Sequence, residues 1–325
     1  MGSISVSATE FPLNTGASIP ALGLGTWQSA PGEVKTAVSY ALKTGYKHID
    51  CAYCYGNEDE VGEGLREAFA TGVKREDVFI TTKLWCTYHS RVEENLDISL
   101  KDLGLDYVDL YLMHWPCPMN PNGNDPKFPK HPDGSRDLDT SWTHIQTWLE
   151  MEKLVKTGKV KAIGVANYSV KYLEELLPHA TIIPAVNQIE NHPSLPQQDI
   201  VDFCKAKGIH ITAYSPLGST GGPLMEAAAV REVANKRKAS PAGVLLSYHQ
   251  PRVEANSPQV ARGSSVLAKS VNPERIKVNA ESLIHLDNSD MDTLNQYSAQ
   301  LQKEGKLTRY VYPSFGVDFG FPDKS

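Results

Sequence analysis

The sequence predicts an α/β protein that folds as one (β/α)8 barrel, a TIM barrel, over residues 1–325. Two observations predict this fold. Eight short apolar runs rich in β-branched residues recur along the chain, and each is followed by a longer amphipathic segment. The runs are mostly continuous rather than alternating, as expected for parallel strands buried on both faces. Eight strand–helix repeats favour a closed barrel over an open sheet.

The predicted strands and helices alternate along the chain. Strands are expected at 21–25, 47–50, 78–84, 107–114, 161–167, 182–188, 210–215 and 265–270. Helices are expected at 31–44, 58–70, 91–103, 141–157, 170–177, 197–207, 224–249, 273–280 and 289–303. In the first helix, Val34, Val38 and Leu42 fall on one face, and Gly45 ends it. The seventh helix is expected to break near Pro241, because proline cannot continue a helix.

Four segments lie outside this alternation. Residues 11–22 predict a β-hairpin, with its turn at 14–16, that lies as a lid over the bottom of the barrel. Residues 116–140 are rich in Pro, Asn, Asp and Gly and follow the fourth strand, so they form a long loop on the C-terminal face, where barrel active sites lie. Residues 250–259 lie on the opposite face, and we interpret them as a surface insertion. A tail rich in Gly, Pro and aromatic residues, 304–325, completes the chain.

The composition narrows the classes of function. With 41% hydrophobic residues, the chain can build a large core. Its formal net charge of −6 argues against nucleic acid as a main partner, since phosphate binding needs a basic surface. No apolar run reaches the ~18 residues of a membrane span, and the N-terminus lacks the pattern of a signal peptide. We therefore expect a cytoplasmic protein that binds neither nucleic acid nor membrane.

Polar side chains stand at the C-terminal ends of the predicted strands, which converge on one mouth of a barrel. The second strand ends at Asp50, and Tyr55 lies just beyond it. The third strand carries Lys83 near its end, and the fourth ends at His114. The next three strands end in further polar residues, which are Asn167, Gln188, Tyr214 and Ser215.

Asp50, Tyr55, Lys83 and His114 form a chemically coherent set. A free tyrosine has a pKa near ~10, so it is a poor acid at neutral pH. The Lys83 ammonium is expected to lower the pKa of the Tyr55 phenol, while Asp50 holds that ammonium in place. His114 can donate a hydrogen bond to a substrate oxygen. The set therefore predicts a general acid that protonates a carbonyl oxygen while hydride reaches the carbon.

Each of these four residues alone could equally belong to a salt bridge or to the packed core. All four together, at the ends of three successive strands, favour a catalytic site, because perturbed groups cluster at such sites. The sequence contains no G-x-G-x-x-G, P-loop, H-E-x-x-H or G-x-S-x-G motif. Rossmann dehydrogenases, P-loop NTPases and α/β-hydrolases therefore lose support.

Cys51 and Cys54 form a C-x-x-C pair, a spacing found in redox and zinc sites. The pair does not begin a helix, as thioredoxin-type pairs do, and no second pair completes a zinc site. We predict that both are packing residues that form no disulfide and bind no metal. The chain carries three more cysteines, which we expect to be free thiols: Cys86, Cys117 and Cys204.

The motifs of the chain, taken in order, resemble those of the aldo-keto reductases over nearly its whole length. They are GLGTWQS (23–29), HIDCAYCYGNEDEVG (48–62), TTKLWCTYH (81–89), LGLDYVDLYLMHWP (103–116), GVANYS (164–169), NQIENHP (187–193), AYSPLGS (213–219) and AKSVNPERI (268–276). Within that family the chain is most similar to fungal NADP-dependent glycerol dehydrogenases and glyceraldehyde reductases.

The resemblance implies a barrel that binds NADP(H) without a Rossmann domain. It makes Tyr55 the proton donor, tuned by Lys83 and Asp50, and it makes His114 the group that orients the carbonyl. It also implies an apolar substrate pocket lined by aromatic side chains, which are Trp27, Trp85, Trp115 and Phe128. An aromatic residue at these positions could equally belong to the core, but placement in loops and at strand ends favours the pocket.

The resemblance further implies which residues hold the cofactor, from its nicotinamide end to its adenosine 2′-phosphate. They are Asn167, Gln188, Tyr214, Ser215, Leu217, Ser219, Lys269, Ser270, Asn272, Arg275 and Asn279. Two cations and a hydroxyl, from Lys269, Arg275 and Ser270, suit the 2′-phosphate dianion and favour NADP over NAD. Taken alone, those two cations would be interpreted as solvated surface charges. The chain departs from the family pattern at Ala166, Ala268 and Val278, where a serine, a proline and a glutamate are usual.

The expected function is the reduction of glyceraldehyde or another small aldose by NADPH, reversible as NADP-linked oxidation of glycerol or another polyol. Two alternatives stay open. One is a xylose or uronate reductase, and the other is a regulatory or sensor subunit that binds NADPH with little turnover. We expect a monomer whose partner is the small carbonyl or polyol substrate.

Overall fold

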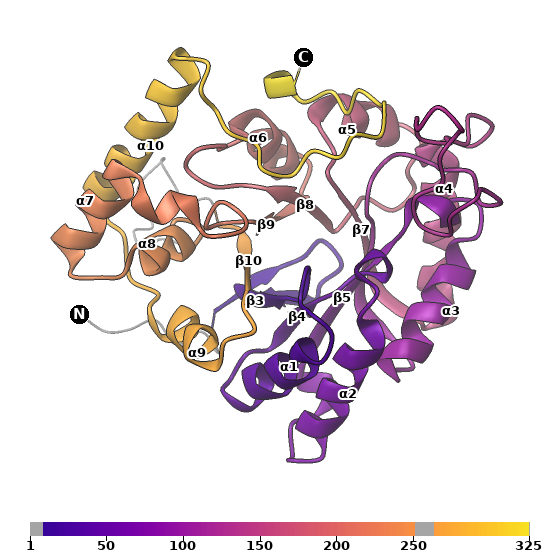
Figure 1. Cartoon of the computed structure of the whole chain (residues 1–325), viewed down its shortest axis with the longest axis horizontal. Helices are drawn as coiled ribbons and strands as arrows, with labels where there is room; N and C mark the ends of the chain where they lie inside the picture. Colours follow the sequence, from indigo (N-terminus) through magenta and orange to yellow (C-terminus); the bar gives the residue numbers. More distant parts are fainter. Residues whose placement is uncertain (1–8, 251–262, 325) are drawn as a thin grey trace.

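The computed structural model describes residues 9–250 and 263–324. Eight parallel strands close into a barrel in the order β10-β3-β4-β5-β6-β7-β8-β9 (Figure 1). Their bounds are β3 (Leu22–Gly25), β4 (His48–Asp50), β5 (Phe79–Leu84), β6 (Val108–Met113), β7 (Val160–Ala166), β8 (Val186–Glu190), β9 (His210–Tyr214) and β10 (Ser265–Lys269). The predicted (β/α)8 barrel is therefore confirmed.

Amphipathic helices surround the barrel, and most of them bury their apolar faces against it (Figure 1). In the described residues they are α1 (Glu33–Lys43), α2 (Glu58–Phe69), α3 (Val92–Leu103), α4 (His144–Leu154), α5 (Val170–Leu176), α6 (Gln198–Ala206), α7 (Ala228–Arg237), α8 (Pro241–Ser247), α9 (Pro273–Glu281) and α10 (Asn288–Lys303). The chain breaks between α7 and α8 as predicted. Ser240 Oγ accepts a hydrogen bond from the Gly243 N–H at 3.0 Å and caps α8, whose first residue is Pro241.

An antiparallel hairpin of β1 (Glu10–Pro12) and β2 (Ser18–Pro20) precedes the barrel. Its Phe11 lies in a buried cluster with Phe79 and Val186, which begin β5 and β8. Phe79 and Val186 are the N-terminal residues of their strands. The hairpin therefore closes the bottom of the barrel, as predicted, and the C-terminal ends of the strands face the opposite side.

The sixth barrel strand is displaced from its predicted position. It was expected at 182–188, but β8 runs over Val186–Glu190. Pro184 has no N–H to give to the ladder, and the first backbone bond of this segment to β7 comes from Ala185 at 2.9 Å. The strand therefore ends later than expected, which brings Glu190 to the C-terminal face.

The tail that follows α10 returns across the C-terminal face and passes α6 and α5 (Figure 1). Its Phe315, Phe319 and Phe321 are buried. The tail therefore packs as part of the fold, on the side of the barrel where the strands end. The expected insertion at 250–259 lies, apart from Gln250, outside the described residues. None of the helices in the described ranges combines the length and the apolar character needed to cross a bilayer.

Candidate active site

The Lys83 ammonium is the centre of a buried polar cluster at the C-terminal ends of β4 and β5. It donates hydrogen bonds to Asp50 Oδ1 at 2.6 Å, to the Cys51 carbonyl at 2.9 Å and to the Tyr55 hydroxyl at 3.3 Å. Lys83 is only 1% exposed and Asp50 only 3%. Three side chains that the sequence placed at neighbouring strand ends thus meet around one nitrogen.

His114 completes the cluster from the end of β6. Its ring lies 5.7 Å from the ring of Tyr55, measured between centroids. Its backbone N–H donates to the Leu84 carbonyl at 3.1 Å, so the pairing of β5 with β6 fixes where the side chain begins. Its Nδ1 is sealed from solvent without a hydrogen-bond partner in the described part of the chain. Nε2 is therefore the ring nitrogen available to a ligand.

Burial sets the protonation states of Tyr55 and His114. Burial first, and then the Asp50 carboxylate, raises the pKa of the Tyr55 phenol well above its ordinary value. The sequence predicted the opposite direction from the Lys83 ammonium alone, and that prediction is wrong because burial and Asp50 outweigh the ammonium. Burial, reinforced by repulsion from Lys83, lowers the pKa of His114 well below its ordinary value. At neutral pH the site holds a protonated phenol and a neutral imidazole.

Asn167, Gln188 and Tyr214 lie beside this cluster, at β7, β8 and β9. Gln188 Nε2 donates to Asp50 Oδ2 at 2.8 Å, and no described residue bonds to its Oε1. Asn167 donates to the His114 carbonyl at 2.9 Å and accepts from the Tyr214 hydroxyl at 2.7 Å. Asn167 has a φ of 62°, a left-handed conformation that is uncommon outside glycine and often found at ligand sites. These groups fit a ligand that carries an amide, because the free Gln188 oxygen can accept its N–H.

The residues assigned to the 2′-phosphate gather at the end of β10 and the start of α9. Lys269 and Arg275 are exposed, and Ser270 is buried. The Asn272 side chain caps α9 by accepting from the Arg275 N–H at 3.0 Å. The N-terminus of α9, with two cations and a hydroxyl beside it, fits a phosphate group. Asn279 lies buried one helical turn beyond Arg275.

The loop assigned to the pyrophosphate follows β9. Ser215 and Ser219 both adopt left-handed backbone conformations, with φ of 52° and 67°. Leu217 packs against buried residues of the core. Gln28 joins this loop to β10, because its side-chain oxygen accepts from Thr220 Oγ1 at 3.4 Å and its carbonyl accepts from Lys269 Nζ at 3.3 Å. The predicted cofactor residues therefore line one continuous side of the barrel mouth, from β7 round to β10.

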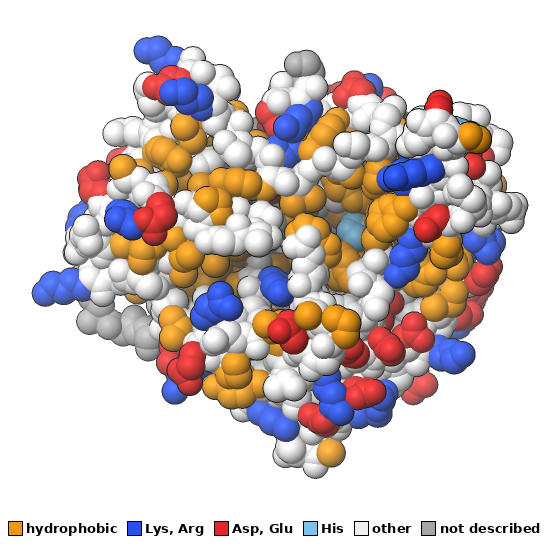
Figure 2. Space-filling view, in the orientation of Figure 1, with side chains coloured by type: hydrophobic (Ala, Val, Ile, Leu, Met, Phe, Trp, Pro, Cys, Tyr) orange, Lys and Arg blue, Asp and Glu red, His pale blue; other side chains and the backbone are white. Residues whose placement is uncertain are grey.

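Trp85 is the centre of an aromatic wall beside His114. Its ring centroid lies 5.3 Å from that of His114, 5.2 Å from Phe128 and 6.2 Å from Phe315. Trp115 joins the wall through Phe315, at 6.1 Å. Figure 2 shows a hollow in this face with many hydrophobic side chains around it and a histidine at its floor. Three of the four predicted pocket residues are thus brought together.

Trp27 stands apart from the other predicted pocket residues. It follows β3 and is 39% exposed, and no ring contact joins it to the wall within the described residues. The sequence missed two members of the wall, Phe315 and Phe319, which come from the tail; Phe319 lies 4.9 Å from Trp115. The high proportion of aromatic residues in the tail could have indicated that the tail contributes to the pocket.

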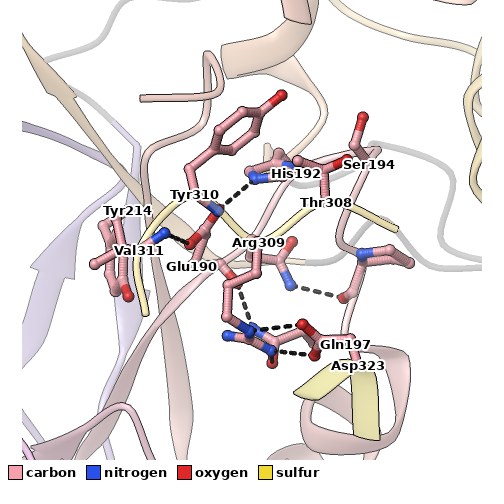
Figure 3. A network of polar contacts seen from close by, with 12 residues as sticks. Glu190, His192, Ser194, Gln197, Tyr214, Thr308, Arg309, Tyr310, Val311 and Asp323 are labelled. Carbon is pink, nitrogen blue, oxygen red and sulfur yellow. Dashed lines mark hydrogen bonds and ion pairs between the residues drawn. The ribbon is translucent and has the colours of Figure 1, made fainter. Parts of the chain in front are cut away.

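A buried clamp holds the tail over the site (Figure 3). Glu190, at the end of β8, is fully buried and accepts hydrogen bonds from the backbone N–H groups of Tyr310 and Val311, both at 2.8 Å. Arg309 donates twice to Asp323, at 2.9 Å and 2.6 Å. Glu190 was not among the predicted site residues, because the strand was expected to end at Gln188. Side chains alternate along a strand, so a correctly placed end would have put both residues on one face.

The thiols of Cys51 and Cys54 take no part in the polar cluster around Lys83. Cys51 and Cys54 are free thiols, and Cys51 is buried in the core, where its Sγ lies 3.0 Å from the Thr81 carbonyl. Burial raises the pKa of Cys54 to about 12, so its thiol stays protonated. The predicted packing role of Cys51 is confirmed. The described residues contain no cluster of His, Cys, Asp or Glu suited to a metal ion.

Comparisons with known proteins agree with this geometry. The model of the aldo/keto reductase family matches residues 21–299. A D-galacturonate reductase of Hypocrea jecorina is 65% identical over 318 residues, which cover 98% of this chain and 99% of that protein. A glycerol 2-dehydrogenase (NADP(+)) of Saccharomyces cerevisiae is 48% identical over 95% of this chain and 96% of its own length. The solved structure of an aldose reductase from Schistosoma japonicum superposes with a TM-score of 0.83, at 41% identity, over 93% of this chain and 94% of the other.

Proposed function

Because this chain belongs to the aldo/keto reductase family, whose members use NAD(P)H, we propose that it reduces the aldehyde group of D-galacturonate with NADPH. Glyceraldehyde and other small polyhydroxy aldehydes are its secondary substrates, and the reverse reaction is NADP-linked polyol oxidation. The observation that carries the proposal is the 65% identity to a D-galacturonate reductase over nearly the whole chain. The catalytic unit is the single barrel, acting as a monomer.

The proposed mechanism assigns one task to each residue of the buried cluster. When bound, the reduced nicotinamide supplies the hydride that reaches the carbonyl carbon. Tyr55 delivers a proton from its hydroxyl to the carbonyl oxygen. Lys83, whose Nζ lies 3.3 Å from that hydroxyl, stabilises the negative charge that the phenol oxygen acquires as its proton leaves. Asp50 keeps the ammonium in position through its bond of 2.6 Å.

His114 orients the substrate in this mechanism. Its low pKa keeps the ring neutral, so Nε2 can donate a hydrogen bond to the carbonyl oxygen only in the tautomer that carries its proton there. Nδ1 has no described partner that would compete for that proton. The aromatic wall around Trp85 excludes water from the same side and so strengthens each polar contact inside.

NADP is preferred over NAD through the exposed pair Lys269 and Arg275. Two cations beside the N-terminus of α9 favour a ligand with an extra phosphate dianion. In the test, kcat/KM is measured for NADPH and for NADH in the wild type and in Arg275→Ala. The NADPH value should fall about tenfold or more, and the NADH value should change little. A parallel fall for both coenzymes would contradict the assignment.

The substrate is tested by following NADPH oxidation with D-galacturonate, DL-glyceraldehyde and D-xylose, and NADP reduction with glycerol. D-galacturonate should give the highest kcat/KM of the four. A higher value for glyceraldehyde would instead favour the glyceraldehyde and glycerol assignment. Tight NADPH binding without turnover of any aldehyde would favour a regulatory subunit.

A further inference from the structure

Arg136 belongs to the loop at 116–140 and lies against the aromatic wall of the site. Its guanidinium carbon is 5.4 Å from the ring centroid of Phe128 and 5.4 Å from that of Phe315. Both rings contact Trp85, which contacts His114. Because aromatic faces attract cations, this packing holds the guanidinium beside the pocket rather than out in the solvent.

The Arg136 guanidinium bonds to no carboxylate in the described residues, although, together with the hydrogen bond from the Phe128 N–H, its charge helps to lower the pKa of the nearby Asp125 carboxyl. Its Nε and Nη1 are sealed from solvent without a hydrogen-bond partner, and no ion pair joins it to any described residue. Sealed N–H groups of a cation are normally paired, since leaving them unpaired costs free energy. Arg309 shows the usual arrangement, with two hydrogen bonds to Asp323. The N–H groups of the Arg136 guanidinium therefore have no hydrogen-bond acceptor in the described residues.

The same loop contains four carboxylates, and Asp133 and Asp139 accept hydrogen bonds from Ser135 and Ser141. Asp125 Oδ1 accepts from the backbone N–H groups of Lys127 and Phe128, at 2.8 Å and 2.6 Å. Asp137, the next residue along the chain, accepts from the Asn120 side chain at 2.9 Å. These two acids shape the loop itself. Within the described residues no acceptor bonds to the guanidinium, and Nη2, which is not sealed, is the nitrogen that an acceptor in the pocket can reach.

A carboxylate at the far end of a short aldehyde would supply that acceptor. A guanidinium matches a carboxylate with two parallel N–H···O bonds. In an open-chain hexuronate, five carbon–carbon bonds separate the carbonyl carbon from the carboxyl carbon, roughly 6 Å when extended. A hydrogen bond adds about 3 Å at each end. From an aldehyde at Tyr55, such a molecule reaches further along the wall past Trp85 than the three-carbon glyceraldehyde does.

We propose that Arg136 is a specificity-determining residue that binds the terminal carboxylate of a hexuronate whose aldehyde lies at Tyr55. This inference deepens the proposed function and rests on it. The loop at 116–140 is then the part of the site that distinguishes sugar acids from neutral sugars of the same length.

The test compares D-galacturonate with its C6 methyl ester, which keeps the aldehyde and the carbon skeleton but removes the charge. kcat/KM is measured for both in the wild type, Arg136→Gln and Arg136→Lys. The wild type should favour the acid about 10- to 100-fold, the effect of charge-assisted hydrogen bonds. Arg136→Gln should bring the acid-to-ester ratio close to 1. Arg136→Lys should give an intermediate ratio, because an ammonium keeps the charge without the fork.

Lys130→Gln is the matched control. Lys130 is exposed and pairs with Arg136 across an antiparallel bridge, so this variant removes the same charge from the same loop. It should keep the acid-to-ester ratio of the wild type. An equal fall in this control, an unchanged ratio in Arg136→Gln, or a wild type without preference for the acid would each overturn the inference. A wild type that reduces no aldehyde would refute the proposed function itself.

Discussion

The floor of the site and its roof are built in different ways. The floor consists of Asp50, Tyr55, Lys83 and His114, which come from the ends of β4, β5 and β6 or the turn just after. The roof consists of the loop at 116–140 and the tail at 304–324. The Lys83–Asp50 bond joins residues 33 positions apart, whereas the bond from Val311 to Glu190 joins residues 121 positions apart. Pairing of neighbouring strands places the residues of the floor, whereas the described tail has no strand pairing with the barrel and is held by contacts such as those with Glu190.

This difference suggests a division of tasks, in which the floor determines the reaction and the roof determines which substrate binds. The floor follows from the barrel itself, because parallel neighbours bring their C-terminal ends to one place. Trp85 links the two regions, since its backbone follows β5 and its Nε1 donates to the Lys127 carbonyl at 2.6 Å. We therefore expect changes in the roof to alter which aldehyde enters without moving Tyr55. Mutations in the two regions should accordingly act on different kinetic constants.

The largest expected effect belongs to the floor. Tyr55→Phe removes the hydroxyl to which we assign the proton transfer and leaves the ring in place, so kcat for D-galacturonate and for glyceraldehyde should both fall about 1,000-fold. Quenching of protein fluorescence by NADPH should give the same dissociation constant as in the wild type. kcat is measured at saturating NADPH from the loss of absorbance of the coenzyme.

Cys54→Ala is the control for Tyr55→Phe, because it changes the adjacent, partly buried side chain without touching the hydroxyl. It should keep kcat within about twofold of the wild type. A Tyr55→Phe enzyme with half of the wild-type kcat would mean that another group donates the proton. The assignment of the reaction to the floor would then be wrong.

The sequence predicted the floor because local signals were enough. Asp50, Lys83 and His114 stand at the ends of apolar runs. When eight such runs close into a barrel, residues at these ends come together at one mouth. The net direction of the Tyr55 pKa was not predictable in the same way. It depends on how completely the phenol is buried, and burial is a property of the whole fold.

The roof escaped prediction because it depends on contacts between distant segments. Because of Pro184, β8 begins and ends later in the sequence than predicted, and it therefore includes Glu190. The hydrophobic pattern alone does not indicate this shift. The ring of Phe315 gave a compositional signal in the tail, but nothing local indicated that it packs against Trp85 and Trp115. Arg136 likewise appeared as one charge in a polar loop. Loop conformation depends on such pairwise contacts, which have no periodicity in the sequence.

An intermediate effect is expected for the clamp of the roof. Glu190→Gln replaces one carboxylate oxygen by an NH2 group, which cannot accept from the backbone of Tyr310 or Val311. Loss of one charge-assisted hydrogen bond should loosen the tail and raise KM for D-galacturonate about tenfold, with a smaller change in kcat. Hydrogen exchange measured by NMR should become faster at those two amides, which reports the clamp directly.

Glu174→Gln, on the exposed surface of α5, is the matched control for the clamp and should change neither KM nor exchange. Faster exchange in Glu190→Gln with an unchanged KM would show that the tail is held by Glu190 but does not shape the pocket. A fall in kcat as large as that of Tyr55→Phe would contradict the separation of floor and roof.

The smallest expected effect is that of pH on the floor. Burial lowers the pKa of His114, a base, so the ring stays neutral as the pH falls through 6.5. Burial raises the pKa of the Tyr55 phenol, so its proton is retained throughout. Saturated kcat should therefore change less than about twofold between pH 6 and pH 8, for glyceraldehyde and D-galacturonate alike. An imidazole with an ordinary pKa near 6.5 would be about three-quarters protonated at pH 6, and kcat would fall about fourfold. Such a fall with both substrates would place the titrating group in the floor, whereas a fall confined to D-galacturonate would place it in the roof.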